Sequence, residues 1–224
     1  MHREIKTTSD GSKTLFINEL NEGYHSHHGA MQEAYHVFIK NGIEKIQKSE
    51  INILELGFGT GLNALVTLDY LLKNQNIKQV NYFTLEKYPI NSEEIKHLAY
   101  YELFNDSRFE AINNAIHQSE WEKAVEILPS FNLTKINTDF YELENLQLPP
   151  IDLVYFDCFG ARVQPDLWEE PLAKMVANKM TTNGLLTTYS SKGSFQRVLK
   201  SLNFKVEKVE GPKGKREMLN AWKL

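Results

Sequence analysis

Short apolar runs alternate along the chain with segments whose apolar residues recur every three or four positions. The short runs predict five strands, at Ile51–Leu56, Val80–Leu85, Leu133–Asn137, Ile151–Phe156 and Leu185–Tyr189. The helical spacing predicts helices at Met31–Ile46, Leu62–Leu72, Trp168–Met180 and Ser194–Leu202, with Asn183-Gly184 ending the third. Strands that alternate with helices indicate a mostly parallel sheet covered on both faces.

Three further segments complete the predicted fold. Ile5–Ile17, with Asp10-Gly11 at its centre, has the pattern of a β-hairpin. Asn91–Leu128 is mostly helical in pattern and predicts a helical insertion over the sheet edge, and Phe204–Val209 with Glu217–Trp222 predicts a closing antiparallel pair. We expect one α/β domain with a seven-stranded sheet at 49–224, and an N-terminal hairpin and helix extension at 1–48 packed on it.

Composition and charge narrow the class of protein. The 224 residues are 42% hydrophobic and 24% charged, which is typical of a globular protein. Cys158 is the one cysteine, so no intramolecular disulfide forms, and a reducing cytoplasm is expected. The first ten residues lack a signal core, and no stretch approaches the roughly 20 apolar residues that span a bilayer, so we expect no membrane association.

The net charge of −4 does not by itself indicate a nucleic-acid binder, but its distribution is uneven. Lys192–Arg216 contains eight basic and two acidic residues, which leaves the rest of the chain acidic. Such a basic segment either holds a phosphate backbone or forms a solvated helix and strand face.

A glycine-rich turn follows the first predicted strand of the sheet. Gly57, Gly59 and Gly61 let the backbone bend sharply and approach a ligand, ahead of a helix start with free N–H groups. A dinucleotide favours G-x-G-x-x-G, whereas this turn reads G-x-G-x-G after Glu55.

Carboxylates fall at or just after four predicted strands: Glu55, Glu86, Asp139 and Asp157. Ligands of such sheets bind beyond the carboxyl ends of the strands, so these side chains are expected in one crevice. An acidic crevice disfavours a pyrophosphate but suits the sulfonium, ammonium and ribose diol of S-adenosylmethionine. Glu86 is expected to accept the ribose hydroxyls and Asp139 the adenine amino group. We therefore predict S-adenosylmethionine as the cofactor, with a nicotinamide dinucleotide or a purely structural turn as alternatives.

Four stretches together resemble a known family: YHSHHGAMQEAYHVFI (24–39), LELGFGTGLN, FDCFGARVQPDLW and GPKGKREML. They are similar to the methyltransferase domain of the bacterial tRNA wobble-uridine enzyme MnmC and to its free-standing form, MnmD. The resemblance implies a Rossmann-like class I methyltransferase with an antiparallel C-terminal strand. It also implies methylation of the exocyclic amine of 5-aminomethyl-2-thiouridine in the tRNA anticodon stem-loop. Bifunctional members carry a fused oxidase; we expect none here, so a separate oxidase or upstream enzyme would supply the amine.

Carried over by motif, the resemblance places Glu55, Gly57, Gly59, Gly61 and Asn63 in the cofactor loop. It places Asp157 and Phe159 in the reaction motif. After Phe159 the chain departs from the family pattern, with Ala161 and Val163 in place of proline and lysine and Gln164 in place of asparagine. This departure bears on the acceptor more than on the reaction class.

The chemistry of amine methylation assigns roles to the remaining candidates. An aliphatic amine has a pKa of roughly 10, so it must lose a proton before it can attack. Asp157 is expected to orient the amine, and it is also the candidate for its base. Phe159 is a candidate to stack on the uracil, with a core position as the alternative. Tyr24 and Met31 are candidate pocket residues, and Lys213, Lys215 and Arg216 are candidate phosphate contacts.

Two other chemistries are weighed and set aside. His25, His27, His28 and His36 match no familiar zinc spacing, so no metal is expected. Cys158 next to Asp157 raises a pyrimidine C5-methyltransferase with a cysteine nucleophile, but a buried cysteine is commonly a small hydrophobe. Two hypotheses stay open beside the tRNA enzyme: a methyltransferase acting on another amine or small molecule, and a non-catalytic tRNA-binding module.

Overall fold

The computed structural model describes residues 2–224. An eight-stranded sheet forms the centre, in the order β10-β11-β9-β8-β4-β5-β7-β6. Six of its strands run in one direction, while β11 and β6 run against their neighbours. The strands are β4 (Glu50–Leu56), β5 (Gln79–Leu85), β6 (Ala124–Leu128), β7 (Phe131–Ile136), β8 (Ile151–Phe156), β9 (Met180–Thr188), β10 (Phe204–Glu210) and β11 (Glu217–Lys223).

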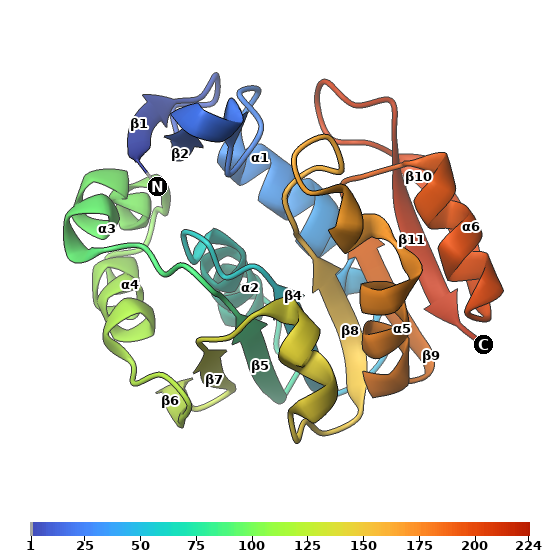
Figure 1. The fold of residues 1–224 in the computed structure, drawn as a ribbon. Coiled ribbons are helices and arrows are strands. Elements are labelled where there is room, and N and C mark those ends of the chain that lie inside the picture. Colours follow the sequence, from blue (N-terminus) through green and yellow to red (C-terminus); the bar gives the residue numbers. More distant parts are fainter. Residues whose placement is uncertain (1) are drawn as a thin grey trace.

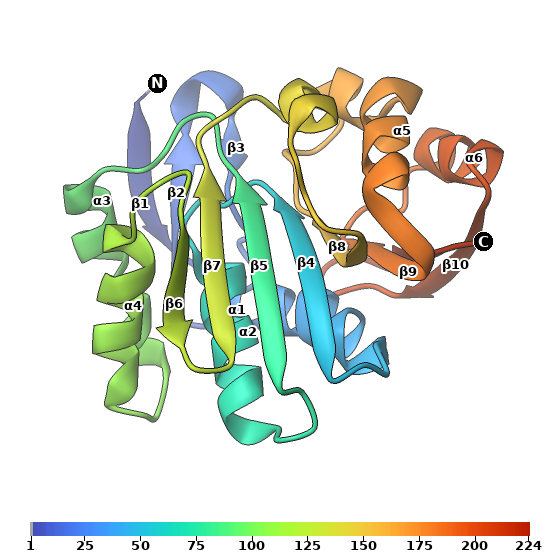
Figure 2. The same cartoon turned by 90° about the horizontal axis from the view of Figure 1, so that it is seen from below.

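Helices cover both faces of this sheet, and α3 and α4 lie beside its β6 edge (Figures 1 and 2). The α-helices are α1 (Ala30–Ala34), α2 (Leu62–Lys73), α3 (Ser92–Leu98), α4 (Arg108–Gln118), α5 (Glu170–Lys179) and α6 (Gly193–Ser201). A π-helix, η2 (Tyr35–Lys40), continues α1, and the remaining short helices are 3₁₀ turns: η1 (Asn18–Leu20), η3 (Ile43–Lys45), η4 (Tyr100–Leu103), η5 (Phe140–Asn145) and η6 (Pro165–Trp168). No helix in the described part of the chain is long and apolar enough to cross a membrane.

Two apolar cores sandwich the sheet because successive side chains of a strand point to opposite faces. In β4, Ile51 and Ile53 join the core that contains α2 and α4, whereas Leu54 and Leu56 join the core that contains α5 and α6. The sheet is therefore packed on both faces, up to the carboxyl ends of its central strands.

The N-terminal segment forms a separate small sheet. β1 (Arg3–Thr7) pairs with β2 (Lys13–Ile17), as the predicted hairpin requires, and β2 also pairs with β3 (Glu22–Gly23). This small sheet lies beside the carboxyl-end rim of the large one, above α1 and α3 in Figure 1. It therefore brings the N-terminal segment to the edge where ligands of this fold bind.

The predicted α/β architecture is confirmed, but the sheet has eight strands and not seven. The extra strand is β6, within the segment predicted to be helical. Val125 and Ile127 alternate with more exposed neighbours, and β6 pairs antiparallel with β7 through a tight turn. The sequence of β6 alternates with a period of two over only five residues. The longer helical pattern that precedes it therefore determined the prediction.

One predicted helix end was wrong, and a second helix ends within one residue of the prediction but not for the predicted reason. The helix predicted at Met31–Ile46 ends at Lys40, where Asn41 and Gly42 break it. Asn183-Gly184 does not end α5, which stops at Lys179; both residues lie within β9, where Asn183 adopts a φ of 63°. Thr181 and Gly184 belong to an irregular stretch where the pairing of β9 with β8 shifts register.

Candidate active site

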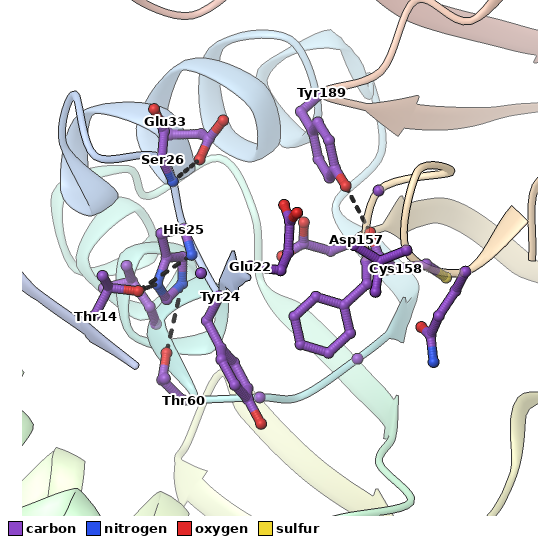
Figure 3. A pocket seen from close by; sticks show the side chains of 18 of the residues that line it. Thr14, Glu22, Tyr24, His25, Ser26, Glu33, Thr60, Asp157, Cys158 and Tyr189 are labelled. Atoms are coloured by element: carbon purple, nitrogen blue, oxygen red, sulfur yellow. Dashed lines mark hydrogen bonds between the residues drawn. The ribbon is translucent and has the colours of Figure 1, made fainter. Parts of the chain in front are cut away.

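A cavity of about 900 Å³ opens at the carboxyl ends of β4, β5, β7 and β8. Its walls come from the glycine turn, from the N-terminal segment 21–28, from the loop 157–167 and from the turn between β10 and β11. Figure 3 shows side chains from the N-terminal segment, the glycine turn and the loop after β8 facing one space. The volume suits a nucleoside-sized cofactor together with a second group.

The glycine turn between β4 and α2 needs glycine for two reasons. Gly57 and Gly59 have φ angles of 98° and 51°, a region that side chains disfavour. A Cβ on Gly57 would lie 3.0 Å from the carbonyl oxygen of Asp157, and a Cβ on Gly59 would lie 3.1 Å from the Tyr24 ring. Gly61 does not line the cavity; it caps α2, and a Cβ there would meet the rings of His117 and Phe58.

Glu86, the residue after β5, forms a hydrogen bond with the glycine turn. Its Oε2 accepts from the backbone N–H of Gly59 at 2.9 Å, and its Oε1 accepts from the N–H of Tyr88 at 2.7 Å. Both oxygens keep a second lone pair, and the residue lines the cavity. The carboxylate is therefore fixed in position and still able to accept from a ligand.

Asp139 lines the cavity at the end of β7 but is already engaged. Asp139 caps η5, because its Oδ1 accepts a hydrogen bond from the N–H of Tyr141. Its Oδ2 lies 2.8 Å from Lys87 Nζ. The Lys87 ammonium, followed by the Tyr141 N–H, lowers the pKa of Asp139. Any amino group that binds here shares the carboxylate with Lys87.

Glu55 lies beneath the cavity and does not line it. It continues the Ile51 and Ile53 side of β4, so it points into the core under α2. Its Oε2 accepts from Thr84 Oγ1 at 2.7 Å, while Oε1 has no partner among the described residues. Complete burial raises the pKa of Glu55 to about 8.

Asp157 follows β8 and faces the cavity. Its Oδ2 accepts from Asn63 Nδ2, in the first turn of α2, at 2.8 Å. Burial raises the pKa of Asp157 to about 7, although the amide of Asn63 opposes the shift. The carboxyl group is thus poised to change its protonation near neutral pH.

Two aromatic residues predicted for the pocket meet inside it. The rings of Tyr24 and Phe159 lie edge to face, with centroids 5.2 Å apart, and both residues line the cavity. Met31, which belongs to α1, does not line the cavity; its side chain packs against the core that contains α2 and α4.

The three basic candidates of the C-terminal turn separate in space. Lys215 lines the cavity, where its Nζ lies 2.6 Å from Glu33 Oε1 and 3.8 Å from the centroid of the Tyr189 ring. Lys213 and Arg216 are exposed and lie outside the cavity.

Several pocket residues were not predicted from the sequence, among them Glu22, Glu33 and Tyr189. Glu33 is only 8% exposed, and its other oxygen accepts from the N–H of Ser26. Tyr189 donates to the carbonyl oxygen of Cys158 at 2.8 Å, as Figure 3 shows. Glu33 could have been found from the sequence, because it is a carboxylate at a core-facing position of a predicted helix. A buried carboxylate requires a partner.

The histidines and the cysteine have other surroundings. His25 Nδ1 forms a hydrogen bond with Thr14 Oγ1 at 3.0 Å. His36 Nε2 forms one with the carbonyl oxygen of Glu210 at 2.8 Å. Among residues 2–224 no group of three or more His, Cys, Asp or Glu side chains is placed to hold a metal ion. Burial raises the pKa of the Cys158 thiol well above its usual range, which opposes thiolate chemistry.

The lining as a whole suits a cationic nucleoside cofactor. The carboxylates of Glu86, Asp139 and Asp157 face the same space as the glycine turn. Such a set of anionic hydrogen-bond acceptors complements a sulfonium and an ammonium and would repel a pyrophosphate. The close approach at Gly57 and Gly59 leaves the room that a side chain would fill.

Comparison with known proteins agrees with this chemistry. Residues 121–224 match the model of a family described as S-adenosyl-L-methionine-dependent methyltransferase. The tRNA 5-methylaminomethyl-2-thiouridine biosynthesis bifunctional protein MnmC of Burkholderia thailandensis is 29% identical over 211 residues, and that of Burkholderia mallei is 30% identical over 216. Each alignment covers 88% of this chain but 31% or 32% of the relative, so the chain spans about a third of these proteins.

A solved structure gives the same placement over nearly the whole chain. The crystal structure of MNMC2 from Aquifex aeolicus superimposes with a TM-score of 0.78 at 25% sequence identity, covering 98% of this chain and 69% of that one. Fold, glycine turn and relatives converge: the chain is an S-adenosyl-L-methionine-dependent methyltransferase that is similar, in sequence and in fold, to part of MnmC.

Proposed function

We propose that this enzyme transfers a methyl group from S-adenosylmethionine to the exocyclic amine of 5-aminomethyl-2-thiouridine at the wobble position of tRNA. The product is 5-methylaminomethyl-2-thiouridine. The relatives named for biosynthesis of that nucleoside support the substrate. The observation that carries the proposal is Asp157, a carboxyl group fixed by Asn63 in the same cavity as the glycine turn and Glu86.

The residues that would hold the cofactor divide into contacts and supports. Gly57 and Gly59 would border it, Glu86 would accept the ribose hydroxyls, and Asp139 would accept the adenine amino group in competition with Lys87. Bound there, the cofactor supplies an electrophilic methyl group. Glu55 and Gly61 do not reach the cavity, so we assign them to shaping the turn and the start of α2. Asn63 lines the cavity but is engaged with Asp157.

The acceptor amine needs alignment and the loss of a proton. Asp157 in its ionised form accepts N–H bonds from the amine and so orients the nitrogen lone pair. Because burial raises its pKa to about 7, the carboxylate is basic enough to share the departing proton at neutral pH. Partial burial of the site also disfavours the charged ammonium form of the substrate.

The RNA would be held by aromatic and basic groups. Phe159 and Tyr24 present ring surfaces inside the cavity, where a base taken out of the stack is commonly held by aromatic side chains. Lys213 and Arg216 are exposed in the turn between β10 and β11, and they would contact phosphates of the anticodon stem-loop.

A second acceptor class is favoured by one observation. Val163 and Gln164 line the cavity, and they belong to the loop where the chain departs from the family pattern. An N-methyltransferase acting on a different amine is therefore the competing function. A non-catalytic tRNA-binding module is the third candidate.

One experiment separates these candidates. The protein is incubated with labelled S-adenosylmethionine and tRNA from a strain that accumulates the aminomethyl intermediate, and the nucleosides are then analysed. Label in 5-methylaminomethyl-2-thiouridine supports the proposal, with Asp157→Asn as the inactive control. Label in another amine selects the second candidate, and tRNA binding without label selects the third.

The setting of the reaction follows from the substrate. We infer that it takes place in the cytoplasm, and that a separate oxidase or other upstream enzyme supplies the aminomethyl group. We also infer that residues 1–48 act as an extension of the catalytic unit 49–224, since Tyr24 and Glu33 contribute to the cavity walls.

A further inference from the structure

We propose that Lys215 recognises the methyl acceptor itself: its ammonium, held inside the cavity by Glu33, donates a hydrogen bond to a carbonyl oxygen of the acceptor base beside Asp157. This inference rests on the proposed function and specifies how the base is read. It also separates Lys215 from Lys213 and Arg216, its neighbours in a basic turn.

The position of Lys215 is set by a carboxylate from the other end of the chain. Glu33 belongs to α1, and Lys215 belongs to the turn between β10 and β11, 182 residues later. Glu33 accepts from Lys215 Nζ through Oε1 at 2.6 Å and from the Ser26 N–H through Oε2 at 2.8 Å. Figure 3 shows the Ser26 contact and places Glu33 on the cavity wall. A carboxylate held on both sides leaves the ammonium little freedom.

The ammonium retains capacity for a ligand. Lysine has three N–H donors. One points to Glu33, and the face of the Tyr189 ring lies 3.8 Å from Nζ, a contact that favours the cation. Among residues 2–224, Glu33 is the one hydrogen-bond acceptor that contacts Lys215 Nζ. The side chain is 35% exposed and lines the cavity, so its free N–H groups are open to a ligand there.

The surroundings connect this donor to the reacting end of the site. Tyr189, beneath the ammonium, donates to the backbone oxygen of Cys158, the residue after Asp157. Burial is the main cause of the raised pKa of Asp157; beyond it, the charge of Glu33 raises and that of Lys215 lowers the pKa of this carboxyl. A carboxylate acceptor and an ammonium donor are thus presented to the same ligand.

This pair matches the edge of a 5-substituted uracil. The carbon that carries the substituent is bonded to the carbon of the 4-carbonyl group, so the amine and that oxygen lie on one side of the ring. An amine on Asp157 would bring the carbonyl oxygen toward Lys215. A cytosine presents an amino group at that place and would confront the ammonium with a second donor.

Lys213 and Arg216 differ in every one of these respects. Both are exposed, neither lines the cavity, and neither forms an ion pair within the described residues. They suit phosphates, which position RNA without reading its bases. Salt dependence distinguishes the two kinds of contact, since each phosphate contact contributes about 0.7–0.9 to the slope of log K against log salt.

The test measures methyl transfer and RNA affinity for Lys215→Met, with an anticodon stem-loop carrying the aminomethyl uridine. Loss of one charge-assisted hydrogen bond is expected to lower the single-turnover rate at saturating RNA by roughly 10- to 100-fold. The salt slope of RNA binding is expected to remain that of the wild type. Lys213→Ala and Arg216→Ala are each expected to reduce this slope, and Lys174→Met, an exposed lysine of α5, is the matched control for loss of a charge.

The double variant Glu33→Gln, Lys215→Met distinguishes a folding defect from the loss of base recognition. This variant leaves no unpaired buried carboxylate, so it should recover the melting temperature without recovering the rate. A Lys215→Met enzyme with a wild-type rate and a reduced salt slope would overturn the inference and make Lys215 a phosphate contact. A wild-type protein that binds S-adenosylmethionine but methylates no stem-loop would instead overturn the proposed function, and the inference with it.

Discussion

The side-chain amide of Asn63 donates to Oδ2 of Asp157 at 2.8 Å. This bond joins the first turn of α2 to the residue that follows β8, across the switch point of the sheet. It fixes the carboxylate that we assign to the amine close to the glycine turn, where we propose that the cofactor binds. The stiffness of the site therefore depends on a contact between two segments 94 residues apart.

The rate of methyl transfer should depend on the ionisation of Asp157. Since burial raises the pKa of Asp157 to about 7, the active carboxylate is depleted below that pH. We expect log kcat/KM to rise with a slope of one as pH increases to about 7 and then to level off. Asp157→Asn should remove this inflection and lower kcat by at least roughly 100-fold. Its affinity for S-adenosylmethionine, measured by calorimetry, serves as the control and should change little.

Replacement of Glu55 by glutamine should stabilise the protein at alkaline pH. The folded-state pKa of Glu55 is raised to about 8 by burial, above its ordinary 4.5, so the wild type loses stability as pH rises from 4.5 to 8. Relative to wild type, Glu55→Gln should therefore gain on the order of 2–4 kcal/mol between pH 5 and pH 9. Urea unfolding at both pH values measures the difference. An equal effect of the substitution at the two values would contradict a buried, protonated Glu55.

Gly57→Ala should impair folding and cofactor binding together. The new Cβ would combine a φ of 98° with a 3.0 Å approach to the Asp157 carbonyl oxygen, so backbone must move. We expect a loss of about 2–3 kcal/mol in the free energy of unfolding and at least a tenfold weaker affinity for S-adenosylmethionine.

Gly11→Ala is the matched control for that substitution. Gly11 has a φ of 84°, but a Cβ there meets nothing within 4 Å. It should cost only the conformational penalty of about 1 kcal/mol and leave cofactor affinity unchanged. Equal loss of affinity in the two variants would show that the close approach at Gly57 is unimportant.

Glu86→Ala should reduce the affinity for S-adenosylmethionine more than it reduces the stability of the fold. The carboxylate accepts from two backbone N–H groups at the rim, and both remain partly accessible to water after its removal. We expect affinity for S-adenosylmethionine to fall by roughly 10- to 100-fold, as for loss of charge-assisted hydrogen bonds to the ribose. Adenosine analogues lacking ribose hydroxyls, used as competitors, should lose the same factor on the wild type but not on the variant.

Cys158→Ser should leave methyl transfer largely intact. The thiol is 2% exposed, and burial raises its pKa far from the range of a nucleophile. Serine keeps the backbone oxygen that accepts from Tyr189. An inactive but folded Cys158→Ser enzyme, judged by circular dichroism, would revive a cysteine-dependent mechanism.

Local pattern sufficed for much of the fold and for bringing the glycine turn, Glu86 and Asp157 to one cavity. The buried strand β8 is an apolar run interrupted only by Asp152, and the predicted Ile151–Phe156 matches its bounds. The G-x-G-x-G turn, with Glu86 and Asp157 after later strands, is a local signal because strand ends in a parallel sheet share one edge. The strand β6 escaped prediction because its alternation covers only five residues after a helical pattern, and it is the pairing with β7 that decides between the two.

Tertiary structure alone decided which charged residues enter the cavity. Glu55 shares the strand-end pattern of Glu86, yet the two-residue period of β4 turns it into the core beneath α2. Lys213, Lys215 and Arg216 are indistinguishable as a basic run, and only the packing of the C-terminal turn against α1 brings Lys215 to Glu33. The physical reason is range: helix and strand periods are set by neighbours in sequence, whereas the partner of a buried charge lies wherever the folded chain brings it.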